Sequence, residues 1–187
     1  MIDVKEIAKL VRKNSKVIIE KLNDGTYNVS NTYFMINLKR DEFRDFFAKF
    51  NSYSSTADIP FNFKGTICSK DGNDFEEIKL NTQAVVSQVG NATYDVYLTL
   101  FYRNIAPGLE ARIVKVGPEL GLFDRRYDFL LNLGSEYKSK GRTQPLYICN
   151  KDKVKACIMP IKNTNVNSLK EQFIELAGNK DLYEDIA

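Results

Sequence analysis

Histidine and tryptophan are absent from this chain of 187 residues, and cysteine occurs only three times. Without histidine there is no Ser-His-Asp or Cys-His machinery, no imidazole metal ligand and no imidazole acid or base. The cysteines, Cys68, Cys149 and Cys157, have no short metal-ligand spacing, and an odd number is a poor disulfide framework. We interpret them as small buried side chains in a reducing compartment, and we expect neither a metal nor a cofactor.

Long apolar runs are lacking as well. No stretch approaches the roughly 20 apolar residues that a membrane-spanning helix needs, and no secretory signal is visible. We therefore expect a soluble, cytoplasmic protein that does not bind membranes. The net charge of +3 is only mildly basic, so overall electrostatics does not indicate a partner.

What is present is a set of alternating helix and strand patterns. Asp3 followed by Glu6 predicts a capped helix start, and apolar residues then recur at helical spacing over residues 4–14. Strands are predicted at Lys16–Leu22 and Thr26–Ser30. The Asp24-Gly25 pair between them indicates a hairpin turn, because glycine accepts positive φ.

A strand at Tyr33–Leu38 is predicted to enter a helix at Lys39–Phe50. In that helix one stripe carries Phe43, Phe46, Phe47 and Phe50, which is typical of a core-facing surface. Further strands are predicted at Phe61–Ser69, Phe75–Leu80, Thr82–Val89, Thr93–Arg103 and Glu110–Val116. The strand at 93–103 has aromatic residues on both faces, which predicts burial on both sides.

The second half of the chain is expected to hold a loop, a long helix and a hairpin. Gly117–Gly121 reads as a loop, and a helix capped by Asp124 is predicted to run to Lys138, although Gly134 weakens it. Pro145–Cys149 and Val154–Ile161 read as the two strands of a closing hairpin. A capping pattern after residue 167 predicts a last helix at Leu169–Ala177.

The patterns together predict an α+β fold. A largely antiparallel sheet is expected to be covered by two main helices, with an N-terminal helix and hairpin and a C-terminal helix. The predicted segments are an N-terminal appendage at 1–32, a main domain at 33–162, and a linker, helix and frayed tail at 163–187.

Three pieces of the chain together resemble one domain of a bacterial sliding DNA clamp. These are the strand and aromatic helix at Tyr33–Phe50, the helix at Phe123–Tyr137, and the hairpin that ends in Met159-Pro160-Ile161-Lys162. The resemblance covers about two-thirds of the chain and rests on short, degenerate motifs. The chain continues for about 25 residues beyond that hairpin, and one such domain would have to oligomerise before it could encircle DNA.

The resemblance implies two kinds of site. The closing segment with Met159, Pro160, Ile161 and Lys162 would help form a pocket for partner peptides. The helices and the basic stretch after them would face DNA through salt-sensitive phosphate contacts. The residues expected to make these contacts are Arg40, Arg44, Lys49, Arg125, Arg126, Lys138, Lys140 and Arg142.

A second short pattern points to the same machinery. The segment from Glu119 to Phe123 is similar to the hydrophobic peptide with which polymerases and repair proteins dock onto a bacterial clamp, with Glu119 in the place of the usual glutamine. Leu122 and Phe123 would then be exposed anchors. The alternative is that this pair attaches the following helix to the core.

Two other functions have a basis in the sequence. Glu77 and Lys79, with Asp58, Asp71 and Asp74 upstream, are similar to the acidic and lysine pattern of Mg²⁺-dependent nucleases. A single-strand binder would instead use the aromatic strand that carries Tyr94, Tyr97, Phe101, Tyr102 and Arg103. A solvated strand edge and a buried core explain these two patterns without any function.

Our hypothesis from the sequence is a non-catalytic binding protein that acts in DNA transactions. It would be a clamp-like module, or a small factor or inhibitor of mobile-element type, that contacts DNA or a DNA-processing protein, and it could form a homo-oligomer. The nuclease and the single-strand binder are the alternatives.

Overall fold

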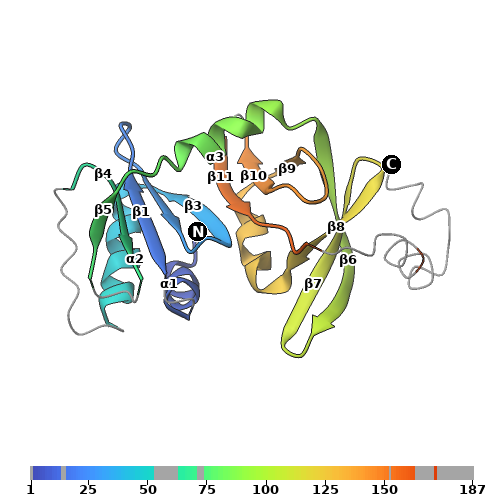
Figure 1. The fold of residues 1–187 in the computed structure, drawn as a ribbon, viewed down its shortest axis with the longest axis horizontal. Helices are drawn as coiled ribbons and strands as arrows, with labels where there is room; N and C mark the ends of the chain where they lie inside the picture. The colour runs from blue at the N-terminus through green and yellow to red at the C-terminus, as the bar shows by residue number, and fades with distance from the viewer. Residues whose placement is uncertain are drawn as a thin grey trace. The chain divides into compact units, whose positions relative to one another are not determined.

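The computed structural model describes residues 2–13, 16–52, 63–70, 74–151, 153–162 and 171. The chain divides into two compact units (Figure 1). Unit 1 comprises Met1–Gln88 with Val154–Cys157, and unit 2 comprises Val89–Lys153 with Ile158–Ala187. The division into three segments made from the sequence stays a prediction, because compactness in the folded state does not show which segments fold on their own.

Unit 1 is built on a twisted sheet. In sheet order its strands are β5 (Glu76–Ile78), β4 (Gly65–Ser69), β1 (Val17–Lys21), β2 (Tyr27–Ser30), β3 (Phe34–Leu38) and β11 (Lys153–Ile158). The pairs from β5 to β3 are antiparallel. The β1–β2 turn contains Gly25 at φ +80°, the left-handed conformation that the Asp-Gly signal predicts.

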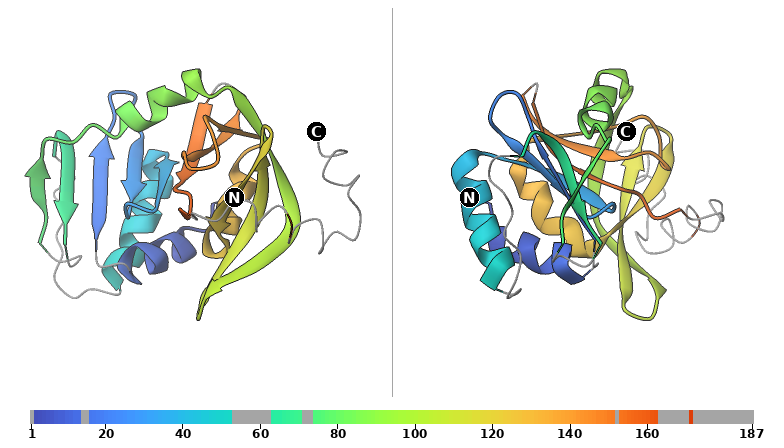
Figure 2. Two further views of the ribbon diagram at one scale, coloured as in Figure 1. Left: turned by 45° about the vertical axis from the view of Figure 1, so that its right-hand side comes forward. Right: turned by 60° about the vertical axis from the view of Figure 1, so that its left-hand side comes forward.

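Two helices, α1 (Val4–Lys13) and α2 (Arg40–Ser52), cover one face of this sheet (Figure 2). The predicted cap is confirmed, since Asp3 Oδ1 accepts a hydrogen bond of 3.0 Å from the Glu6 backbone N–H. The predicted phenylalanine stripe of α2 is buried. Its Phe43 ring stacks on Tyr27 of β2 with ring centroids 4.0 Å apart, which locks α2 onto the sheet.

The covered face of the sheet carries an apolar row that crosses β4, β1, β2 and β3. Its members stand opposite one another in the strand register and are Ile67, Ile19, Val29 and Ile36. Each is at most 2% exposed. Because side chains alternate between faces along a strand, the neighbouring residues of the same strands point to the other face, which α1 and α2 do not cover.

Unit 2 contains the strands β10 (Leu146–Asn150), β9 (Glu136–Ser139), β6 (Tyr94–Ala106), β7 (Leu109–Val116) and β8 (Glu119–Asp124), in sheet order. All of these neighbouring pairs are antiparallel. The 3-10 helix η2 (Arg125–Leu133) packs against the sheet through Tyr127, Leu130 and Leu131, which are buried. One apolar cluster of this unit consists of Ala111, Ile113, Leu120 and Leu122.

The prediction of an α+β fold with two main covering helices is wrong. Eleven strands dominate the described part of the chain, and its helices are short. The predicted helix from Asp124 to Lys138 ends as η2 at Leu133, after which the chain turns into β9. The reason is Gly134, which is extended and so close to β10 that a Cβ atom would lie 2.3 Å from the Cys149 carbonyl oxygen. A continuing helix cannot make that contact.

Three local predictions were also wrong. The predicted strand Thr82–Val89 forms the short helix α3 (Gln83–Ser87) and the start of a 3-10 helix, η1 (Gln88–Asn91), both without buried residues. The predicted loop Gly117–Gly121 is mostly β8, because its leucines enter the core of unit 2. The aromatic strand β6 is not buried on both faces, since Tyr97 is 46% and Leu100 is 87% exposed.

The predicted C-terminal linker, helix and tail lie outside the described residues except for residue 171. Among the helices that the structure does describe, none has both the length and the apolar character needed to cross a lipid bilayer.

The three cysteines should differ sharply in reactivity. Burial raises the pKa of Cys157 to about 12 and also raises the pKa of Cys149, so both thiols stay protonated at pH 8. Cys68 is half-buried and only donates a long hydrogen bond to the Ser69 carbonyl. We expect a maleimide to label Cys68 in the native protein and the other two only in denaturant, as mapped by mass spectrometry. The Cys68→Ser variant should not be labelled by the maleimide under native conditions. Rapid native labelling of Cys157 would contradict this packing.

Candidate functional site

The uncovered face of the unit 1 sheet carries a polar row, which we define as Thr66, Glu20, Asn28 and Asn37. The register places Thr66 opposite Glu20, Glu20 opposite Asn28, and Asn28 opposite Asn37. Thr66, Glu20 and Asn28 are buried, and Asn37 is half-buried. Each lies directly beside a member of the apolar row along its strand, so the two rows lie on opposite faces of the sheet.

A directed chain of hydrogen bonds begins at Glu20. The Thr82 backbone N–H, at 2.8 Å, and the Thr82 hydroxyl both donate to Glu20 Oε2. With its proton used in this way, the Thr82 hydroxyl oxygen accepts from Asn28 Nδ2 at 2.8 Å. This bond orients the Asn28 amide, whose Oδ1 in turn accepts from Asn37 Nδ2 at 3.0 Å.

A second chain of hydrogen bonds reaches the Asn37 amide from the β1–β2 turn. Thr26 donates its backbone N–H and its hydroxyl to Asp24 Oδ1, at 3.0 and 2.7 Å. The Thr26 oxygen then accepts from Asn37 Nδ2 at 3.0 Å. Both N–H groups of Asn37 are therefore engaged, and among the described residues its Oδ1 has no hydrogen-bond partner. Two carboxylates fix the direction of this one amide oxygen.

The polar row also holds the chain segment that leads into α3. Thr66 Oγ1 donates to the Leu80 carbonyl oxygen at 2.6 Å, and Glu20 and Asn28 hold Thr82 two residues later. Thr82 is 5% exposed, whereas α3 has no buried residue. The position of α3 over the sheet therefore depends on hydrogen bonds to the row rather than on apolar packing.

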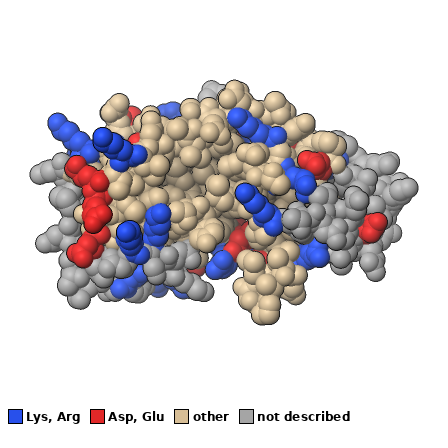
Figure 3. All heavy atoms as spheres, in the orientation of Figure 1, with Lys and Arg blue, Asp and Glu red and all other residues tan. Residues whose placement is uncertain are grey.

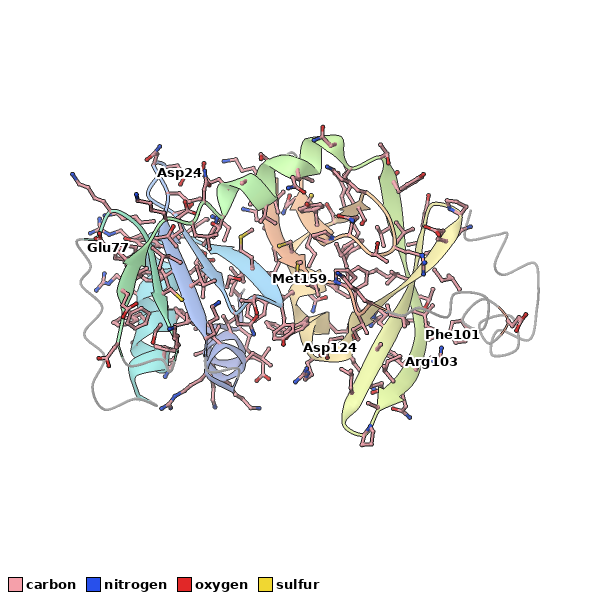
Figure 4. All side chains as sticks on the ribbon, viewed as in Figure 1. Asp24, Glu77, Phe101, Arg103, Asp124 and Met159 are labelled. Atoms are coloured by element: carbon pink, nitrogen blue, oxygen red, sulfur yellow. The ribbon has the colours of Figure 1, made fainter. Side chains whose placement is uncertain are left out.

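A pocket lies beside Asn37 within unit 1. Its volume is about 420 Å³, within the usual range for small-molecule sites. Asn28, Asn37 and Met35 of the sheet line it, together with side chains from the β1–β2 turn, from α3 and from β11. These other lining residues are Leu22, Asn23, Asp24, Gln83, Val86, Ser87, Val154 and Lys155. Figure 4 shows Asp24 at the tip of the β1–β2 hairpin.

The lining combines amides, one ammonium group, one carboxylate and aliphatic surface. Lys155 is half-buried and forms no ion pair with any described residue. Asp24 already accepts two hydrogen bonds from Thr26. The pocket thus offers a fixed acceptor at Asn37, a cation at Lys155 and apolar contact at Leu22, Met35, Val86 and Val154. This combination can orient a small ligand that has both a donor edge and an acceptor or anionic group.

The residues predicted to contact DNA fall in both units and stay predictions. In unit 1, Arg40, Arg44 and Lys49 lie on the exposed face of α2. In unit 2, Arg125 pairs with Glu110, Arg126 with Asp124, Lys138 with Glu136 and Arg142 with Glu119. Lys140 is half-buried. Acidic and basic side chains are interspersed on the face drawn in Figure 3. The acidic partners neutralise the paired arginine and lysine side chains of unit 2, and this weakens their attraction for phosphates.

The residues predicted to bind a partner are arranged in two ways. Leu122 and Phe123 are 1% and 3% exposed within β8, so they are core residues and not an exposed anchor. Met159 is 40% exposed, Pro160 is half-buried and Lys162 is exposed. Ile161 packs on the apolar cluster of unit 2, and its N–H donates to the Leu122 carbonyl at 2.8 Å. Their role in partner binding stays a prediction.

The residues of the two alternative functions are dispersed. Glu77 and Lys79 are exposed at the β5 edge, whereas Asp58 and Asp71 lie outside the described residues. In the part of the chain that the structure describes, no group of three or more acidic or cysteine side chains could hold a metal ion. On β6, Tyr94 is 39% and Tyr97 is 46% exposed. The side chains of Phe101, Tyr102 and Arg103 are half-buried.

Tyr102 belongs to a network that the sequence did not reveal. Its hydroxyl donates to Asp128 at 2.9 Å, and Asp128 also accepts from Arg112 Nε at 3.0 Å. Burial and this hydrogen bond raise the pKa of Tyr102. Burial lowers the pKa of Arg112, but the attraction of Asp128 outweighs it and the pKa is raised overall. These groups satisfy one another, which indicates that the network joins η2 to β6 and β7 rather than forming a reactive site.

Sequence reasoning also missed the polar row. A signal was present, because Glu20, Asn28 and Asn37 are polar residues next to apolar ones in predicted strands, at positions that point away from the helix-covered face. Thr82 carried no such signal, since it lies 54 residues from Asn28 and 62 residues from Glu20.

The Thr82→Val variant tests the network with almost no change in shape. It removes the hydroxyl, so Asn28 loses its acceptor and Glu20 loses a donor, both in a buried place. We expect a loss of about 1–3 kcal/mol in the free energy of unfolding, measured by urea denaturation with an unchanged slope. The Thr82→Ser variant keeps the hydroxyl and should retain more stability. Equal stability of the two variants would show that the methyl group matters and the hydrogen bonds do not.

Comparisons of this chain with protein-family models, with curated protein sequences and with solved structures found no match. The resemblance to a sliding-clamp domain therefore stays a prediction from short motifs. No relative supplies a function, so the functional conclusion depends on the geometry of the chain itself.

Proposed function

We propose that this protein binds a small polar ligand in the pocket of unit 1 and acts as a binding protein rather than as an enzyme. The observation that supports this most directly is the doubly held Asn37 amide, whose Oδ1 has no hydrogen-bond partner among the described residues. The Asn37 side chain is half-buried in the pocket lining, so this oxygen can accept a hydrogen bond from a ligand that enters the pocket.

Pre-organisation adds to this support. Binding loses free energy when flexible side chains must be ordered, and that cost is smaller when the protein has already ordered them. Asn37 is held by Thr26 and Asn28, and these are held by Asp24 and Thr82. The recognising amide therefore rests on a supporting shell of hydrogen bonds, which is the arrangement that precise binding sites use.

The cellular setting proposed from the sequence is cytoplasmic, in DNA transactions. The three free cysteines suit a reducing compartment. In this proposal Arg40, Arg44 and Lys49, which are exposed on α2 beside Asp41 and Asp45, would contact phosphates. In this proposal, ligand binding in the pocket and contact with a larger partner take place on the same unit.

A pair of valines on α3 permits a matched test. Val86 lines the pocket and Val85 does not, although both are half-buried on the same short helix. In a thermal-shift screen of nucleosides, nucleotides, amino acids and sugars, we expect at least one class to stabilise the wild type. A ligand at ten times its Kd adds about 1.4 kcal/mol, or about 3–6 °C in Tm. The Val86→Phe variant should lose this shift because the ring fills the pocket.

The Val85→Phe variant is the control and should keep the shift. If every class in the screen leaves the wild-type Tm unchanged at millimolar concentration, the pocket does not bind small ligands of these kinds. If Val86→Phe keeps the shift, the ligand binds outside this pocket, and if both variants lose the shift equally, the substitutions disturb α3 rather than fill the pocket.

A further inference from the structure

We propose that the ligand of the unit 1 pocket is a nucleotide, with its base edge on Asn37 and its phosphate at Lys155. This inference rests on the proposed function and specifies the chemistry of the ligand. Three features of the pocket support it, namely the direction of the Asn37 amide, the charge of Lys155 and the apolar surface of the lining.

The Asn37 amide presents a fixed acceptor to the ligand. Asn37 offers Oδ1, because its two N–H groups are used by Thr26 and Asn28. Asn28 stands opposite Asn37 in the strand register and is only 1% exposed, so it orients the Asn37 amide and does not contact the ligand itself. An N–H group on the edge of a nucleobase can donate to the Asn37 oxygen, and amide side chains read base edges in this way in other nucleic-acid complexes.

The aliphatic and thioether lining suits the faces of the same ring. Leu22, Met35, Val86 and Val154 all line the pocket. A thioether makes favourable contacts with aromatic rings, and branched aliphatic side chains cover a flat ring face without competing for its polar edge. A free sugar has no aromatic ring to place on this surface.

Lys155 provides the contact for an anion. It is half-buried in the pocket lining and has no ion pair with a described residue. The opposite charge in the lining, Asp24, is engaged by Thr26. A single amino acid could use both charges, but it would leave much of a pocket of about 420 Å³ unfilled, whereas a nucleotide carries both the ring and the phosphate.

The test compares nucleotides with nucleosides on the full chain. Isothermal titration with AMP, GMP, CMP and UMP, and with the four nucleosides, should give tighter binding of at least one nucleotide than of its nucleoside. The Lys155→Ala variant should weaken that nucleotide about tenfold or more and leave the nucleoside unchanged. The Lys153→Ala variant, two residues away on the same strand and exposed, should change neither Kd.

The contact between the base and Asn37 is tested by a second variant. The Asn37→Ala variant should weaken nucleotide and nucleoside by a similar factor of about two- to tenfold, because both carry the base. In the unaltered protein, the side-chain amide resonances of Asn37 should shift on titration with the bound nucleotide. This second measurement does not depend on whether a variant folds. Shifts confined to other residues would overturn the assignment.

A free nucleotide and the end of a nucleic-acid strand share this chemistry, and a dinucleotide with a 5′ phosphate separates them. Tighter, Lys155-dependent binding of the dinucleotide would identify a strand end, and binding of the mononucleotide alone would identify a free nucleotide. If amino acids or sugars stabilise the protein and no nucleotide binds, the nucleotide assignment is wrong while the pocket keeps its function. If nothing binds, both proposals fail.

Discussion

The interaction on which unit 1 depends is the pair of hydrogen bonds from Thr82 to the buried carboxylate of Glu20. A buried carboxylate is costly unless donors satisfy it, and an ionised one can only accept. The Thr82 proton must therefore point at Glu20, which leaves the Thr82 oxygen to accept from Asn28 and the Asn28 oxygen to accept from Asn37. The Glu20 carboxylate sets the direction of the bonds in this chain, Asp24 holds Asn37 from the other side through Thr26, and the Asn37 side chain lines the pocket.

The two faces of the unit 1 sheet have different roles, because successive side chains of each strand point to opposite faces. Ile19 and Val29 of the apolar row meet the helix-covered core, where Tyr27 stacks on Phe43. Glu20 and Asn28, one residue away, meet the segment that carries α3. The apolar packing and the recognition groups thus use opposite faces of the same strands.

The pocket supports a function better than the surfaces indicated by short motifs do. Leu122 and Phe123 are core residues, and Arg125 and Arg126 are paired with acids. Asn37, by contrast, is held from two directions while one of its polar atoms stays free for a ligand. Lys155 adds a charge to the same space. Convergence of several groups on one cavity is stronger support than an exposed residue on a single element.

Local contacts explain what the sequence determined by itself. The Asp3 cap, the Asp24-Gly25 turn and the phenylalanine stripe of α2 depend on residues within a few positions of one another, and all three are present in the structure. Tertiary contacts decided the rest. Gly134 ends η2 because β10 lies against it, and Thr82 leads into a helix because Glu20, 62 residues away, holds it. The sequence shows that Asn37 is polar, but only the folded sheet shows which residues hold its amide.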